Sequence, residues 1–333
     1  MTNEENNYFE KGLEFLNKGL YKEAIINFDE VLKINQENDA AWSNKGLAFS
    51  NLGKYDEANI CYDEALKINP KNIDTWNDKG VLLDRLGKYD EAIICYDEVL
   101  KINPENDRTL SNKGLTLGNL GRNDEAIKCI NEALEINPDN DAAWSNKGDV
   151  TNNLGKYDEA ITYYNEALKI NPENVDTWHN IGVALSYLGR YEEVINCCDE
   201  VLKINPRYEN AWYNKGLALD NLGRSDEAII CYDEVLKINP ENENAWNNKG
   251  NALGCLGRYG DAIICFDKAL ETNPKNQWAL FNKGLALSIL KMYDQAIETF
   301  YQVIELDPDS DFANEANKEI NELKYKKSRK KYW

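Results

Sequence analysis

Residues 39–72 read DAAWSNKGLAFSNLGKYDEANICYDEALKINPKN. The tryptophan, glycine, tyrosine, alanine and proline residues of this stretch return at matching places every 34 residues. Nine consecutive frames begin at residues 5, 39, 73, 107, 141, 175, 209, 243 and 277, and they continue to Ser310 without an insertion. Places within a frame are called positions 1 to 34 below. A period of this length, repeated this often, indicates a chain built from one structural unit in tandem.

Each unit is predicted to fold as two antiparallel helices. At 100° per residue, positions 4, 7, 8 and 11 fall on one helical face. The first helix is expected to end at Gly53, which adopts a left-handed conformation without a steric penalty, and Pro70 ends the second. Position 8 is glycine in all nine frames, and position 20 is alanine in all but the sixth, which has Val194. These small residues are expected to let the two helices approach closely, and hairpins that cannot cover their rings alone should stack.

The pattern resembles the tetratricopeptide repeat, whose W…LG…Y…A…F…A…P signature it follows over residues 5–310. The resemblance implies an all-α solenoid, a right-handed superhelix of antiparallel helix pairs whose first helices line a concave groove. Position 7 departs from the family, because it is lysine in most frames, as at Lys45. We expect the aliphatic part of this lysine to lie on apolar surface while its ammonium group reaches water.

The segments on either side of the repeats differ in character. Residues 311–324 are predicted to form one amphipathic helix that covers the open end of the stack. The basic residues after it are expected either to be a solvated end or to dock on the protein's own acidic surface or on an acidic partner. The predicted segments are an N-terminal start at 1–4, repeats at 5–38, 39–72, 73–106, 107–140, 141–174, 175–208, 209–242, 243–276 and 277–310, a capping helix at 311–324 and a basic tail at 325–333.

The sixth frame, 175–208, is irregular. It has Ile181 at position 7, Val194 in place of alanine at position 20, and Cys198 in place of the ring at position 24. A larger residue at position 20 with a smaller one at position 24 suggests either a local exchange of volume or an altered twist that shapes the groove.

Charge and cysteine placement limit the classes of partner and compartment. The formal net charge is −20, which opposes binding to nucleic acid or to an anionic membrane. No N-terminal signal or transmembrane segment is apparent, because the polar start passes directly into helical patterning. Six of the eight cysteines occupy position 23, and stacked repeats would hold them about 9–10 Å apart, beyond the roughly 7 Å that a disulfide allows. We therefore expect free thiols in a reducing cytoplasm.

The sequence predicts no catalytic, cofactor-binding or metal site. It contains one histidine, His179, so there is no second imidazole for a zinc site or a proton relay. The recurring Gly-Lys-Tyr-Asp-Glu-Ala segments lack the strand and the GK[ST] context of a phosphate-binding loop. We therefore expect a noncatalytic protein without a cofactor.

Positions 2, 5, 6, 9, 12 and 13 point away from the packing face and are predicted to line the groove. Position 6 is asparagine in most repeats. An asparagine amide both donates and accepts, as capture of an extended peptide backbone requires. The alternative is that each amide bonds locally between neighbouring helices. The asparagines of the predicted groove are Asn44, Asn112, Asn146, Asn180, Asn214, Asn248 and Asn282.

Aromatic residues are added to the predicted groove in frames six to nine. They are His179, Tyr187, Tyr213, Trp278 and Phe281. Exposed aromatic side chains are where binding energy tends to concentrate, so these residues are candidates for a partner-binding anchor. The alternative is that the last two pack against each other or against neighbouring helices.

These observations favour a noncatalytic scaffold or adaptor that binds a peptide or protein segment in its concave groove and acts as a monomer. Two other functions stay open: a self-associating structural repeat protein, and an accessory module of a larger enzyme or glycan-handling complex. Neither nucleic acid nor a membrane is an expected partner.

Overall fold

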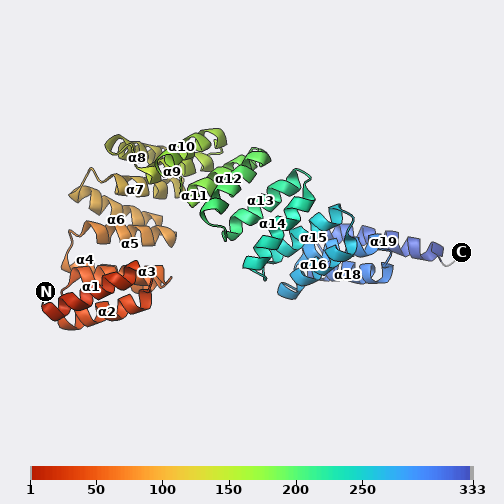
Figure 1. Cartoon of the computed structure of the whole chain (residues 1–333), viewed down its shortest axis with the longest axis horizontal. Helices are drawn as coiled ribbons and strands as arrows, with labels where there is room; N and C mark the ends of the chain where they lie inside the picture. Colours follow the sequence, from red (N-terminus) through yellow and green to blue (C-terminus); the bar gives the residue numbers. More distant parts are fainter. Residues whose placement is uncertain (1, 331–333) are drawn as a thin grey trace. The chain divides into compact units, whose positions relative to one another are not determined.

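The computed structural model describes residues 2–330, and within them it contains nineteen helices and no strand (Figure 1). Consecutive helices pair along the chain, and one further helix follows the ninth pair. The predicted all-α fold of tandem helix pairs with a C-terminal capping helix is therefore confirmed. The chain divides into two compact units, one ending at Pro172 and the other beginning at Glu173, and each is described separately.

The first unit consists of five helix pairs. The helices are α1 (Asn3–Asn17), α2 (Tyr21–Ile34), α3 (Asp39–Asn51), α4 (Tyr55–Ile68), α5 (Ile73–Arg85), α6 (Tyr89–Ile102), α7 (Asp107–Asn119), α8 (Asn123–Ile136), α9 (Asp141–Asn153) and α10 (Tyr157–Ile170).

The second unit consists of four pairs and the capping helix. The helices are α11 (Val175–Tyr187), α12 (Tyr191–Ile204), α13 (Glu209–Asn221), α14 (Ser225–Ile238), α15 (Glu243–Cys255), α16 (Tyr259–Thr272), α17 (Gln277–Ile289), α18 (Tyr293–Leu306) and α19 (Asp311–Lys330).

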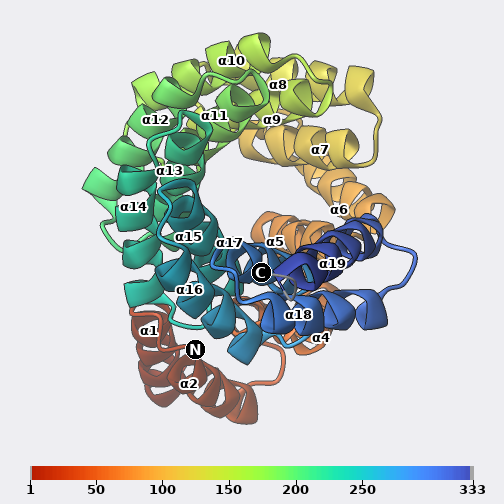
Figure 2. The same cartoon turned by 90° about the vertical axis from the view of Figure 1, so that its right-hand side faces the viewer.

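The first helices lie on the inner side of each unit. In the first unit α3 contacts α5 and α5 contacts α7, and in the second α13 contacts α15 and α15 contacts α17. Figure 2 shows α11, α13 and α15 following one another along the inner side of the second unit, with α12, α14 and α16 outside them. The groove positions therefore belong to helices that are neighbours in space.

Local signals at the helix ends explain the hairpin. An asparagine at position 34 begins most first helices; the side-chain oxygen of Asn38, for example, accepts a hydrogen bond from the backbone N–H of Ala41 at 2.9 Å. Such a cap satisfies a backbone donor that the helix itself leaves unpaired. Gly53 ends α3 with φ at 74°, as predicted, and Lys291 adopts φ at 63° at the equivalent place after α17.

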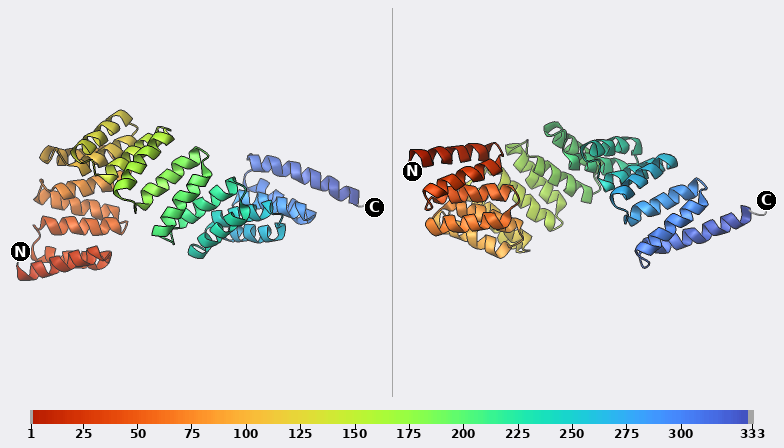
Figure 3. Two further views of the ribbon diagram at one scale, coloured as in Figure 1. Left: turned by 45° about the horizontal axis from the view of Figure 1, so that its top comes forward. Right: turned by 90° about the horizontal axis from the view of Figure 1, so that it is seen from below.

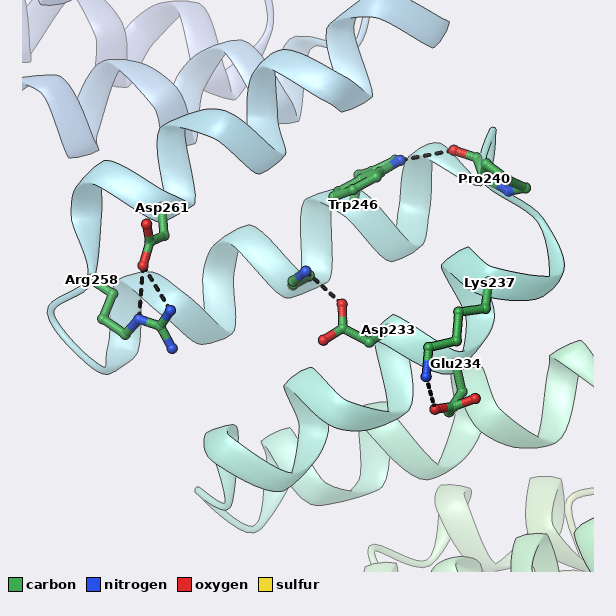
Figure 4. Close-up of polar contacts among 8 residues, drawn as sticks. Asp233, Glu234, Lys237, Pro240, Trp246, Arg258 and Asp261 are labelled. Atoms are coloured by element: carbon green, nitrogen blue, oxygen red, sulfur yellow. Dashed lines mark hydrogen bonds and ion pairs between the residues drawn. The ribbon is translucent and has the colours of Figure 1, made fainter.

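The lysine at position 7 is bonded between successive pairs. The ammonium group of Lys249 on α15 donates to Asp233 on α14 at 2.5 Å and lies 5.4 Å from the ring centre of Trp246. Figure 4 shows Asp233 and Trp246. The side chain of Lys249 is only 19% exposed. The ammonium is thus bound by a carboxylate of the preceding pair, a contact that the sequence pattern did not predict. Equivalent pairs are Lys45–Asp29, Lys79–Asp63, Lys113–Asp97, Lys215–Asp199 and Lys283–Asp267.

Helix α19 covers the last helix pair and is longer than predicted (Figure 3). Its Phe312 ring centre lies 5.4 Å from that of Phe281 on α17. The helix continues to Lys330, so the predicted basic tail is helical up to that residue, and residues 331–333 lie outside the described chain. Lys327 of the predicted tail pairs with Asp294, next to Lys324 at the end of the predicted capping helix, which donates to the hydroxyl of Tyr301 at 2.8 Å. The first part of the tail therefore docks on α18 of the same chain.

Candidate functional site

In eight of the nine helix pairs, the side chain at position 24 lies directly against the glycine at position 8. A Cβ atom placed on Gly216 would lie 2.6 Å from Cε1 of Tyr232, and one on Gly250 would lie 2.6 Å from Cε1 of Phe266. Since real Cβ atoms do not approach this closely, only glycine leaves room for the ring at this distance from the first helix. In the fourth repeat Ile130 takes this place and would contact the same Cβ on Gly114 at 2.4 Å.

In the sixth repeat, where Cys198 stands at position 24, no ring or other large side chain lies against the glycine. A Cβ on Gly182 would have Cβ of Cys197 as its nearest neighbour, at 3.8 Å. A cavity of about 360 Å³ opens here between α11, α12 and α13. The extra methyl groups of Val194 do not fill the space that the missing ring leaves. The interpretation as a compensating exchange of volume is therefore wrong.

The cavity has an apolar interior and polar residues at several points of its wall. Val194, Cys197 and Cys198 are buried in it. Burial raises the pKa of the Cys197 and Cys198 thiols to about 12, so both side chains are neutral at physiological pH and act as small apolar groups. The remaining lining residues are Trp178, His179, Gly182, Val183, Ser186, Tyr187, Val201, Ala211, Asn214 and Leu217.

Three predicted groove residues meet at this cavity. His179 and Tyr187 lie on α11, Asn214 lies on α13, and all three line the cavity. Tyr187 is 67% exposed. The signal for the cavity was present in the sequence, because Gly182 stands at position 8 while Cys198 replaces the ring that normally contacts it. Sequence reasoning identified the replacement but did not infer the opening.

Two other predicted groove aromatics are packing residues. The ring centre of Tyr213 lies 6.2 Å from that of Tyr232, and the ring centre of Phe281 lies 5.7 Å from that of Phe300. Each is therefore a position-5 ring that packs on the position-24 ring of its own repeat. For Phe281 the alternative of packing against neighbouring helices is the one that the structure shows.

Trp278 lies apart from these rings. It is 39% exposed and lines a second hollow of about 420 Å³ together with Asn282 and residues of α15 to α17. Gly254 leaves room in this wall, since a Cβ there would meet nothing within 4 Å. Trp278 and the cavity of the sixth repeat are thus separate features of the second unit.

Most asparagines of position 6 form hydrogen bonds within the protein. Asn248 donates to the hydroxyl of Tyr213 at 2.9 Å, and Asn146 donates to Oγ of Ser111 at 2.9 Å. These bonds join first helices of successive repeats, as the local-bonding alternative predicts. Each uses the amide nitrogen as donor, and each amide also carries an accepting oxygen. The same kind of bond joins Asn112 to Asn77 and Asn282 to Asn251, whereas Asn44 donates to the backbone oxygen of Ala40.

Within residues 2–330, no group of three or more histidine, cysteine, aspartate or glutamate side chains is arranged to hold a metal ion. Over the same residues, no helix combines the length and the apolar character needed to cross a bilayer.

Models of the family described as "Tetratricopeptide repeat" match seven segments, at residues 40–72, 73–106, 108–140, 175–208, 209–242, 243–276 and 278–310. Further matches cover residues 6–38, 129–162 and, under the description "TPR repeat", 148–189. These segments make up more than half of the chain. It belongs to the tetratricopeptide repeat family. This family and fold are typical of noncatalytic scaffolds for protein interactions.

Solved tetratricopeptide repeat structures share the fold. A repeat protein from Parabacteroides merdae has a TM-score of 0.59 at 20% identity, covering 75% of this chain and 99% of its own. The C-terminal part of a repeat-containing protein from Cytophaga hutchinsonii has a TM-score of 0.62 at 17% identity, covering 71% and 97%. YrrB, described as a TPR protein with an unusual peptide-binding site, has a TM-score of 0.50 at 19% identity, covering 58% and 99%. No curated protein matches this chain in sequence.

Proposed function

We propose that the protein is a noncatalytic scaffold or adaptor that binds an extended peptide or protein segment along the first helices of its second unit. One observation carries this proposal: the cavity of the sixth repeat is lined by His179, Tyr187 and Asn214, all at predicted groove positions. A pocket with an apolar interior and a few polar groups at its wall is the usual form of a binding site.

The asparagine row supports binding of backbone beside this pocket. Where the half-buried Asn282 donates to Asn251 at 2.9 Å, its orientation is held before a ligand arrives. An oriented amide oxygen can accept a backbone N–H at a smaller entropic cost than a mobile one. The row therefore suits a segment recognised partly through its backbone.

The net charge supports a protein partner, and the cysteines support a reducing compartment. We propose that this compartment is the cytoplasm. The formal net charge of −20 opposes nucleic acid and anionic membranes. All eight cysteines are free thiols, as a reducing compartment would keep them.

Selection from a random peptide display library on the purified chain tests the proposal. We expect enrichment of peptides that bind the wild type. His179→Ala or Asn214→Ala should weaken the binding of a selected synthetic peptide, raising its Kd about tenfold. Ile230→Ala is the matched control, since Ile230 is 60% exposed on α14 outside the cavity, and it should leave the Kd unchanged. Failure to enrich any peptide, or equal binding by all variants, would overturn the proposal.

The proposed adaptor acts as a monomer. Sedimentation velocity over a concentration series should give one species of the monomer's mass. Concentration-dependent association would instead favour the self-associating structural function.

A further inference from the structure

Seven of the nine repeats place an aromatic ring of their own against the glycine at position 8. An isoleucine takes this place in the fourth repeat, and in the sixth the cavity lies there instead. The chain therefore contains several filled examples of the same site beside one that is open. The rings are Phe28, Tyr62, Tyr96, Tyr164, Tyr232, Phe266 and Phe300.

We propose that the cavity of the sixth repeat receives one aromatic side chain, phenylalanine or tyrosine, from the bound segment. The partner's ring takes the place that the repeat's own ring takes elsewhere. This inference rests on the proposed peptide-binding function and names the residue type that anchors the peptide.

His179 provides a contact for such a ring. It occupies position 5 on α11, and three other repeats have an aromatic residue there that packs on the ring at position 24. The ring centres are 5.7 to 6.2 Å apart in these pairs, which is a favourable distance for tilted aromatic contacts. The imidazole of His179 lines the cavity, so a ring entering it would form the fourth such pair. The existing pairs are Phe9–Phe28, Tyr213–Tyr232 and Phe281–Phe300.

The shape and chemistry of the wall fit a flat apolar ring. Gly182 leaves the backbone of α11 uncovered, as the glycine does wherever a ring lies on it. Val183, Val194 and Leu217 supply apolar contacts from three helices. The volume of about 360 Å³ is ample, since an apolar cavity of roughly 150 Å³ is enough to bind benzene.

The polar wall residues favour entry from the groove side. Ser186 and Asn214 lie at positions 12 and 6, which are groove positions, and both line the cavity. The hydroxyl of Ser186 donates to the carbonyl oxygen of Gly182 at 2.8 Å, and its oxygen can still accept a hydrogen bond. In the seventh repeat the residue at this same position, Asp220, accepts from the hydroxyl of Tyr232 at 2.7 Å. A tyrosine in the cavity would thus have an acceptor at the equivalent position.

The test introduces an aromatic ring at position 24 of the sixth repeat by mutation. Val194→Ala with Cys198→Phe gives the sixth repeat the residues that the eighth has at Ala262 and Phe266. Because this change fills a cavity, the variant should fold with a thermal midpoint at or above that of the wild type. Ile230→Phe is the matched control, since it adds a phenyl group on α14 and leaves the cavity open.

Small-molecule analogues of the side chains serve as probes of the cavity: toluene for phenylalanine and p-cresol for tyrosine. Methylcyclohexane is an aliphatic probe of similar size. Near-saturating toluene or p-cresol should raise the thermal midpoint of the wild type and of Ile230→Phe by a few degrees. The Val194→Ala/Cys198→Phe variant should show no shift. Whichever of toluene and p-cresol raises the thermal midpoint more identifies the preferred side chain, phenylalanine or tyrosine. Equal shifts in all three proteins, an equal or larger shift with methylcyclohexane, or no shift in the wild type would overturn the inference.

A peptide selected on the wild type separates this inference from the proposed function. The affinity of this peptide should fall about tenfold or more when its phenylalanine or tyrosine is replaced by alanine. The same loss is expected when the unchanged peptide binds to the Val194→Ala/Cys198→Phe variant. A peptide that binds both proteins equally would leave peptide binding in place and refute the ring site. Absence of any selected peptide refutes the proposed function, and the inference with it.

Discussion

The side-chain oxygen of Asn77 accepts a hydrogen bond from the hydroxyl of Thr109 at 3.3 Å. These residues occupy position 5 of the third repeat and position 3 of the fourth. In the eighth and ninth repeats the same two places hold Asn247 and Ala279. Asn247 is completely buried, and neither its side-chain nitrogen nor its oxygen has a hydrogen-bond partner. The absence of this hydroxyl group thus leaves the buried amide oxygen of Asn247 without the donor that Asn77 has, which costs stability.

Ala279→Thr should therefore stabilise the second unit, by about 1 kcal/mol, because the new hydroxyl can donate to Asn247 as Thr109 does to Asn77. Slower amide hydrogen exchange in α15 and α17 would show this. Ala245→Thr is the matched control: Ala245 is equally buried at position 3, but Tyr213 takes the place of the asparagine before it. An equal gain from both substitutions would contradict the explanation.

Alanine at position 8 should have opposite effects in adjacent repeats. Gly216→Ala places a Cβ 2.6 Å from the ring of Tyr232 and should destabilise by about 1–3 kcal/mol through overpacking. Gly182→Ala meets no atom closer than 3.8 Å and should be neutral or stabilising by up to about 1 kcal/mol, since alanine favours helix. Urea unfolding followed by circular dichroism compares the two. A similar loss from both would show that the cavity is closed in solution.

Tyr208→Asn should stabilise the start of α13. Tyr208 occupies the N-cap position with φ at −77° and ψ at 99°, but its side chain makes no capping bond. Asn242 has nearly the same backbone conformation and caps α15 by accepting from Ala245 at 2.9 Å. The substitution should gain about 1 kcal/mol, measured as slower hydrogen exchange in the first turn of α13. Tyr208→Ala, which supplies no acceptor, should not reproduce the gain.

Asp78→Asn should stabilise the first unit in a pH-dependent manner. Burial raises the pKa of Asp78 to about 6, above the value of about 3.9 expected in the unfolded chain. The folded state therefore favours the protonated carboxyl, and the wild type loses stability as the pH rises from about 4 to 6. The asparagine variant, which has no charge to bury, should be more stable by about 2 kcal/mol above pH 6.

The same gain should disappear below about pH 4, where the carboxyl is protonated in both states. Urea unfolding at a series of pH values measures it. Glu105→Gln removes an exposed carboxylate from the loop after α6 and should leave the pH profile unchanged. A gain of equal size at pH 3.5 and pH 7 would rule out burial of the charge as its cause.

How far the groove could be predicted depends on what each residue contacts. Positions facing away from the packing stripe of the first helix were identified from periodicity, and His179, Tyr187 and Asn214 do line a cavity there. The same periodicity could not distinguish Tyr213, whose ring packs on Tyr232, or Phe281, whose ring packs on Phe300. A face of an isolated helix is defined by angle alone, whereas its exposure depends on the helices packed beside it.

The sequence by itself determined the helix pair, its repetition and its small-residue contacts, because caps, breakers and apolar spacing act within a few residues of one another. Only the tertiary structure decided which polar groups are already bonded. Asn248 and Tyr213 are 35 residues apart, and Lys249 and Asp233 are 16 apart, so their bonds exist only once helices stack. The cavity beside Gly182 was decided in the same way: a missing ring becomes a pocket only where three packed helices fail to close over it.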